Sequence, residues 1–248
     1  MAAQLSSCEL SEAAPPAKAT EATRAVEKIE IAYQHSGWGS IEENYLIKPY
    51  GDDFIIVPDT ARQRGHGGPA IVPTVKAIPV AQVQQLLEAW NAPVVPRAQG
   101  LHAVAATMSS QSLTEALEKE SADWNLACDT QMRRYKQQLA STSTTYRLLD
   151  GYYGTGIRWT DDYPIIEVRI HRGDQAVATI RSDAQQDLML PWKRNGMETW
   201  DPNISHAVAT LLPEASHVRQ RLLGKSLTTA IAGDAIYELE RLCRGRAG

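Results

Sequence analysis

Two stretches of the chain share a pattern of short β-strands, and this pattern limits the folds that the chain can adopt. Each stretch predicts two β-strands on either side of a Gly-Asp turn, followed by a short apolar helix. The first has its strands within residues 45–59 and its helix over residues 80–90. The second has its strands within residues 165–183 and its helix over residues 204–212. A unit of this kind buries one sheet face against its own helix.

The two stretches align at Gly51 and Gly173, and apart from the Gly-Asp pair the aligned residues barely match. The pattern therefore predicts an α+β fold of antiparallel β units, each followed by a short helix. It leaves two alternatives open for their origin: an internal repeat, or two instances of a common arrangement. It also leaves open whether the strands form two small sheets or one shared sheet.

Two longer amphipathic helices complete the predicted fold. Ser112 and Glu115 have the spacing of a capping box, which predicts a helix from there to about Ala140. Its apolar positions repeat every eleven residues, which keeps them on one face of a helix roughly 40 Å long. These positions are Leu113, Leu117, Trp124, Cys128, Tyr135 and Leu139. A second long helix is predicted over residues 222–243.

The remaining segments are assigned from composition and short apolar runs. Residues 102–108 and 146–149 are short and apolar, which favours β-strands. The start of the chain is rich in Ala, Ser, Glu and Pro, as mobile tails are. The predicted organisation is a disordered tail over 1–23, a first β-β-α unit over 24–110, a connecting helix over 111–145, and a second β-β-α unit with the C-terminal helix over 146–248.

Composition excludes some partners and compartments. Hydrophobic residues make up 43% of the chain and charged residues 22%, so the chain can form a packed core. The formal net charge of −4 argues against a nucleic-acid backbone as the main partner. No apolar run reaches the roughly 18 residues of a membrane helix, and residues 1–18 lack the pattern of a secretory signal.

The three cysteines predict a reducing environment. Their number is odd, and no two of Cys8, Cys128 and Cys243 form a Cys-x-x-Cys pair. A disulfide framework is therefore not expected, and the chain is predicted to be cytoplasmic.

Motifs for the common catalytic sites are incomplete. Gly224-Lys225-Ser226 matches the end of a phosphate-binding loop, but Arg219 stands where that motif needs glycine. No serine lies in the Gly-x-Ser-x-Gly turn of a hydrolase. The six histidines lie far apart in the sequence, so no metal ligands and no cofactor are predicted.

One catalytic alternative remains. Asp162, Glu167 and Arg169 resemble the acidic strand of a Mg²⁺-dependent phosphodiester hydrolase, in which carboxylates hold the metal. Arg169 weakens this hypothesis because a guanidinium does not give up its proton. Alternating charges on an exposed strand explain Glu167 and Arg169 equally well.

A third hypothesis is an anion or nucleotide sensor. Residues 62–68 read Arg-Gln-Arg-Gly-His-Gly-Gly and are predicted to form a flexible loop. Arg62, Arg64 and His66 would bind the anion there, assisted by free backbone amides.

Loop aromatics favour binding to another protein. Trp38, Trp159, Trp192 and Trp200 lie in or beside predicted loops, and Trp and Tyr are common at binding surfaces. The alternative is that Trp192 and Trp200 pack beneath their loops. With the acidic pair Asp161 and Asp162, the loop tryptophans define the predicted contact surface.

The sequence therefore predicts a binding protein in preference to an enzyme. The hypothesis is an intracellular, bacterial protein-interaction module of the inhibitor, immunity or adaptor type. Its partner is another protein, with no role for a membrane or a nucleic acid. The reason is that every catalytic motif tested is incomplete.

Overall fold

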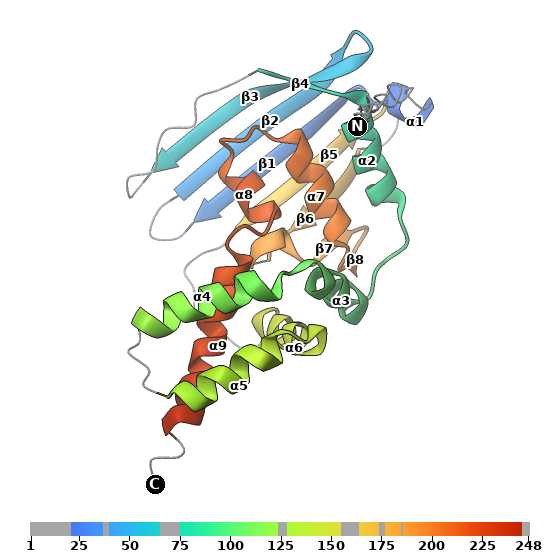
Figure 1. Ribbon diagram of the computed structural model, residues 1–248. Helices are drawn as coiled ribbons and strands as arrows, with labels where there is room; N and C mark the ends of the chain where they lie inside the picture. Colours follow the sequence, from blue (N-terminus) through green and yellow to red (C-terminus); the bar gives the residue numbers. More distant parts are fainter. Residues whose placement is uncertain are drawn as a thin grey trace, which may run out of the picture.

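The computed structural model describes residues 21–36, 40–64, 75–123, 128–154, 164–173, 177–184 and 186–244. The fold is α+β. Its strands form one antiparallel sheet in the order β4-β3-β2-β1-β5-β6-β7-β8. Helices lie against one face of the sheet, and a group of helices extends beyond it (Figure 1). Of the two arrangements left open by the sequence, the shared sheet is therefore the one observed.

The first half of the sheet is a four-stranded meander between two helices. Its elements are α1 (Glu21–Arg24), β1 (Lys28–Ser36), β2 (Ser40–Tyr50), β3 (Asp53–Arg64), β4 (Lys76–Ile78) and α2 (Val80–Asn91). Three helices then lead away from the sheet and a fourth returns to it. These are α3 (Arg97–Thr107), α4 (Ser110–Asp123), α5 (Asp129–Leu139) and α6 (Thr142–Tyr152).

The second half is also a four-stranded meander followed by a helix. Its elements are β5 (Ile165–His171), β6 (Ala178–Ser182), the 3₁₀ turn η1 (Asp187–Met189), β7 (Trp192–Arg194), β8 (Met197–Thr199) and α7 (Pro202–Leu211). The chain ends with α8 (His217–Leu222) and α9 (Leu227–Arg244), which lies against α4, α5 and α6.

The two halves meet where β1 pairs with β5, with Ile31 opposite Val168. Both halves thus run helix, four strands, helix. Both Gly51 and Gly173 adopt a positive φ, as the predicted turns require. However, Gly51 joins β2 to β3, whereas Gly173 follows β5. Their alignment therefore matches different hairpins, and a common origin of the halves stays a prediction.

Alternation along the strands explains why one face of the sheet is buried. On β1, Ile29, Ile31 and Tyr33 are buried beneath the helices, whereas Lys28 and Glu30 lie on the other face. Successive strand residues point to opposite faces, so an apolar residue at every second position gives one core-facing side.

Two predicted strands are helices. Residues 102–108 fall in α3, and residues 146–149 fall in α6. In α3 the buried residues Leu101, Val104 and Ala105 follow a helical spacing, and β-branched residues are few. The helical period becomes visible only when the residues before position 102, which include the buried Gly100 and Leu101, are considered with the apolar run.

The predicted connecting helix is also wrong, because α4 and α5 are separate helices. Leu113 and Leu117 are buried on α4, and Tyr135 and Leu139 are buried on α5. An eleven-residue period satisfies a straight helix and two shorter ones alike, so it could not distinguish them. Helix α4 also starts earlier than expected, since the Ser109 hydroxyl accepts a hydrogen bond from the Ser112 amide.

The cysteine prediction fails as well. Cys128, before α5, forms a disulfide with Cys243 in the last turn of α9, and their Cα atoms are 5.9 Å apart. The two residues are 115 positions apart, so no short-range spacing could reveal the pair.

A close backbone contact fixes α3 beside the end of the sheet. A Cβ atom added at Gly100 would lie 2.0 Å from the carbonyl oxygen of Trp200, so only glycine fits here. The Trp200 amide also donates a hydrogen bond to the carbonyl oxygen of Val95, just before α3. These contacts tie the start of the helical part to the segment after β8.

A charged cluster holds α5, α6 and α9 together. Both guanidinium NH2 groups of Arg147 contact the Glu238 carboxylate, at 2.5 and 3.0 Å. The Tyr135 hydroxyl donates to the same carboxylate at 2.8 Å. The hydrogen bond from Arg147 is the largest cause that holds the pKa of Glu238 below its ordinary value.

Replacing Glu238 by glutamine is expected to lower the free energy of unfolding by about 1 kcal/mol at pH 7. This figure allows for the exposure of 33% of the side chain. A lowered carboxyl pKa gives stability that is present above the ordinary pKa and is lost as the pH falls through the folded-state pKa. Urea unfolding should therefore separate wild type from Glu238→Gln at pH 7 and separate them less near pH 3. Glu240→Gln, which affects only a pair within α9, is the control. An equal difference at both pH values would contradict the assignment.

Candidate functional site

Of the four tryptophans predicted for the contact surface, the structure describes Trp192 and Trp200, and both lie in the core. Trp192 is fully buried, and its indole N–H donates to the Ser205 hydroxyl at 2.9 Å. Trp200 is 8% exposed, packs edge-to-face on Tyr153, and lies beneath the guanidinium of Arg97. Both therefore pack beneath their loops, which is the alternative that the sequence left open.

The other predicted binding residues are only partly described. Trp38, His66, Trp159, Asp161 and Asp162 lie outside the described residues.

The basic loop is described only at its start. Arg62 and Arg64 belong to β3, where their backbones pair with Glu42 and Ser40 of β2. The predicted loop over residues 62–68 is thus extended strand as far as Arg64. The anion-sensor hypothesis stays a prediction.

The catalytic alternative gains no metal site from the described residues. Glu167 and Arg169 lie on β5 and form an ion pair with each other. Within the ranges that the structure describes, no group of three His, Cys, Asp or Glu side chains is placed to hold a metal ion. Because Asp162 lies outside those ranges, the complete trio stays an untested prediction.

The strongest candidate is the face of the sheet opposite α2, α7 and α8. In Figure 1 the described helices lie on one side of the sheet, and none of them covers the other side. We call this side the open face. Strand register places together on it Lys28, Glu30, Ala32, Asn44, Leu46, Lys48, Ile55, Val57, Glu167, Arg169, His171, Arg181 and Lys193.

Charged residues gather on the open face around β1 and β5. Lys28 Nζ lies 2.6 Å from one carboxylate oxygen of Glu30, and His171 Nε2 lies 3.1 Å from the other. The hydrogen bond from Lys28, supported by His171, holds the pKa of Glu30 below its ordinary value although partial burial opposes this. The centre of the face is therefore ionic at neutral pH.

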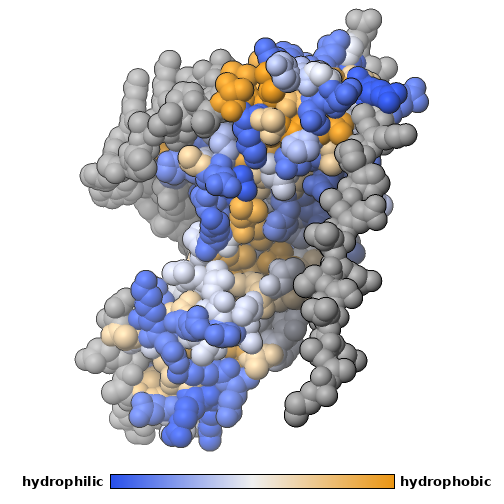
Figure 2. All heavy atoms as spheres, turned by 45° about the horizontal axis from the view of Figure 1, so that its top comes forward, coloured by the Kyte–Doolittle hydropathy of each residue, from blue (hydrophilic) through white to orange (hydrophobic). Residues whose placement is uncertain are grey.

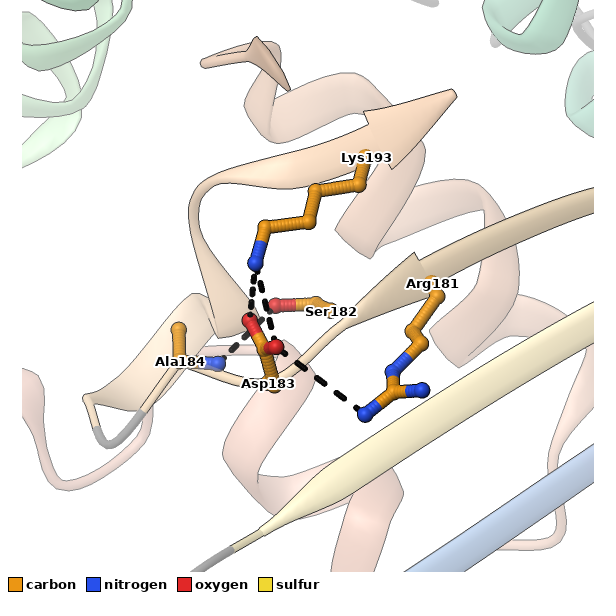
Figure 3. A network of polar contacts seen from close by, with 5 residues as sticks. All are labelled: Arg181, Ser182, Asp183, Ala184 and Lys193. Atoms are coloured by element: carbon orange, nitrogen blue, oxygen red, sulfur yellow. Dashed lines mark hydrogen bonds and ion pairs between the residues drawn. The ribbon is translucent and has the colours of Figure 1, made fainter. Parts of the chain in front are cut away.

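A second charged group lies toward the β7 side of the face (Figure 3). The Lys193 ammonium is 2.9 and 3.0 Å from the two carboxylate oxygens of Asp183, and Arg181 is 4.0 Å from one of them. The three side chains are at least 40% exposed. Two cations thus share one anion, which leaves this group with a positive excess available to a partner.

A shallow depression of about 320 Å³ lies over β1, with β2 on one side and β5 on the other. Ala32 lies at its base because its short side chain stands between Asn44 and Glu167 in the strand register. Leu46, on the β2 side, adds apolar surface that is only half-buried. The open face therefore offers a hollow, an apolar side and a charged side.

Apolar surface also continues toward the β4 end of the sheet. Ile55 and Val57 of β3 are half-buried, and Val75 beside β4 is 67% exposed. Figure 2 shows hydrophobic surface gathered at the top of the molecule, bordered by hydrophilic surface. Such a mixture is typical of protein-binding surfaces, which pair an apolar centre with a polar rim.

Sequence reasoning missed the open face, although its signal was present. The alternation over residues 28–33 places Lys28, Glu30 and Ala32 on the face opposite the buried Ile29, Ile31 and Tyr33. Ala32 in particular has no reactive or polar side chain. It contributes to the depression only because it is smaller than its neighbours.

The chain matches no protein-family model, no curated protein and no solved structure. Among the described residues, no helix is both long enough and apolar enough to cross a membrane. The function is therefore inferred from the geometry and charge of the molecule itself.

Proposed function

We propose that this protein binds a folded protein partner through the open face and has no catalytic activity of its own. The observation that carries the proposal is a broad sheet face that no described element covers. The face combines half-exposed apolar side chains with solvated charges. An inhibitor, immunity or adaptor role in a bacterium is the class of function that fits such a module.

The open face has the size that a specific interface needs. Strands lie about 4.8 Å apart and rise about 3.3 Å per residue. Eight strands with about six residues each therefore present roughly 700 Å² of one face. Standard-size interfaces bury about 600–1,000 Å² on each partner. A single partner could thus be held by this face alone.

The charges specify what the partner presents. Arg181 and Lys193 favour an acidic group opposite the β6–β7 side. Leu46 and Ile55 favour an apolar side chain opposite the β2–β3 side. A side chain from the partner would enter the depression at Ala32. We therefore expect an acidic protein surface with an apolar protrusion beside it.

Reversing two charges on the open face is expected to weaken binding of the partner at least tenfold. Arg181→Glu and Lys193→Glu would place three carboxylates together and repel an acidic partner, which costs more than about 1.4 kcal/mol. Tagged wild-type and variant proteins would capture partners from the source cells, with Kd then measured on the purified pair.

The control is Lys119→Glu with Arg133→Glu, which makes the same charge change on exposed positions of α4 and α5. It should bind the partner as wild type does. A partner that binds the open-face variant and wild type equally would exclude this surface.

The prediction of a cytoplasmic location depends on the absence of a disulfide framework. The Cys128–Cys243 bond removes that argument and favours a compartment in which thiols become oxidised.

A further inference from the structure

A cavity of about 510 Å³ lies between the sheet-covering helices and the helical part below. It opens between α3, the start of α4, the start of α7 and the turn that joins α8 to α9. In Figure 2, hydrophobic surface continues down to the waist between these two parts of the molecule. The cavity lies among helices, whereas the proposed partner surface is the opposite face of the sheet.

The inner wall of the cavity is apolar. Val104, Leu188 and Leu227 line it, and each is only 4% exposed. They come from α3, from η1 and from the start of α9, which are elements held in place by the main core. The wall is therefore preformed, and an apolar body placed against it would leave water.

Five polar side chains that form no hydrogen bond with another described residue surround this wall. They are Gln99, Ser112, Asn203, His206 and Thr228, from four different helices. In the part of the chain that the structure describes, none of these five side chains makes a hydrogen bond, so both amides and the imidazole are free to bind. A few polar groups converging on an apolar wall is the usual form of a small-molecule site.

The charge of the lining limits the ligand class. Asp201 and His206 are its only ionisable residues, and no Lys or Arg is among the described residues that line it. The Asp201 carboxylate is already engaged, because it accepts the Asn203 amide at 3.0 Å as the N-cap of α7. A phosphorylated ligand would find no cation here, whereas an uncharged one needs none.

A second hollow of about 420 Å³ lies on the α2 side of α7 and shares Asp201, Asn203 and His206 with the first. Asn203 and His206 are exposed, so they stand between the two hollows and can reach a ligand in either.

We infer that the cavity binds a small uncharged heteroaromatic molecule. Its flat apolar body would lie on Val104, Leu188 and Leu227. Its edge would exchange hydrogen bonds with the amides of Gln99 and Asn203, which each supply a donor and an acceptor. A volume near 510 Å³ is within the range of small-molecule sites.

The test uses adenine, benzimidazole and nicotinamide as neutral probes, with AMP and inorganic phosphate as anionic ones. Fragments of this size bind with Kd values of about 0.1–5 mM, which amide NMR spectra of the labelled full chain can measure. We expect at least one neutral probe to shift the amides of residues 109–112, 201–206 and 224–228 selectively. Failure of all neutral probes to bind would overturn the inference, as would a preference for AMP over adenine of tenfold or more.

Ala103→Trp separates this cavity from other sites. Ala103 is an exposed residue on the rim, so tryptophan would enter the cavity without disturbing the core. We expect binding to weaken at least tenfold. Ala106→Trp, also exposed on α3 but outside the lining, should leave the Kd within twofold.

Asn203→Ala provides a second variant that does not add bulk. Its side chain makes no hydrogen bond with the described residues, so the fold should tolerate the change, and binding should weaken threefold or more. Unchanged binding in both Ala103→Trp and Asn203→Ala would place the probe elsewhere. Partner capture through the open face tests a different surface, so the two proposals can fail separately.

Discussion

Replacing Glu43 by alanine is expected to lower the free energy of unfolding by about 3–5 kcal/mol, because two buried hydroxyls and a half-buried amide lose their common acceptor. Glu43 lies on β2 and is fully buried. Its carboxylate accepts hydrogen bonds from the hydroxyls of Tyr45 and Ser216, both at 2.6 Å, and from the amide of His217 at 2.9 Å. The substitution would therefore detach the start of α8 from the sheet.

The neighbouring residue provides the control. Glu42 points to the open face and contacts only the Asn44 side chain among the hydrogen bonds described. Glu42→Ala should therefore change stability by no more than about 0.5 kcal/mol. Urea unfolding monitored by circular dichroism measures both. Similar losses in the two variants would mean that Glu43 does not bind its partners as described.

Glu43→Gln adds a finer test. Glutamine keeps the shape of the side chain and one acceptor oxygen, but its NH2 group would face donors. We expect it to lose less stability than alanine and more than any Glu42 variant.

Removing the disulfide by Cys128→Ser with Cys243→Ser is expected to cost about 2–5 kcal/mol of unfolding free energy. The bond joins residues 115 positions apart, and closing a long loop restricts the unfolded chain most. We expect α5 and the last turn of α9 to lose their structure first, because the bond connects them. Chemical denaturation without reductant gives the value.

Thiol counting checks the bond directly. Of the three cysteines, only Cys8 lies outside the pair, so the denatured, unreduced protein should show one reactive thiol. Reduction should raise the count to three. Cys8→Ser keeps both bonded cysteines and is the matched control. Three thiols before reduction would show that the protein as isolated carries no such bond.

Much of the sheet could be predicted because its signals are local. Ile29, Ile31 and Tyr33 alternate, and Gly51 marks a turn with positive φ. Helices that begin at or just after a proline, such as α7 and α2, are also predicted close to their observed limits. Their periodic apolar residues lie within a few positions of each other.

The predictions that are wrong concern features that depend on tertiary contacts. Residues 146–149 suit a strand by composition, yet Leu148 and Leu149 are buried on α6 against neighbouring helices. The division of α4 from α5 depends on how both pack on α9. Cys128 and Cys243 meet only because that packing brings them together.

The candidate site could not be predicted from the sequence, because its residues also come together only through tertiary contacts. Glu30 and Arg169 become neighbours only through the pairing of β1 with β5. Glu43 could have been suspected, since it shares the inward parity of Tyr45 and Ile47 on β2. Nothing in the sequence, however, pairs it with Ser216.

The seam between β1 and β5 has a consequence for synthesis on the ribosome. The first meander and α2 are complete by Asn91, but the strand that covers β1 extends from Ile165 to His171. At about 5–20 residues per second, the nascent chain would present β1 as an unpaired edge for roughly ten seconds. Unpaired edges invite pairing with other chains. The nascent chain is thus most exposed to wrong strand pairing after its first half has been synthesised and before β5 can pair with β1. A chaperone would be most useful during this interval.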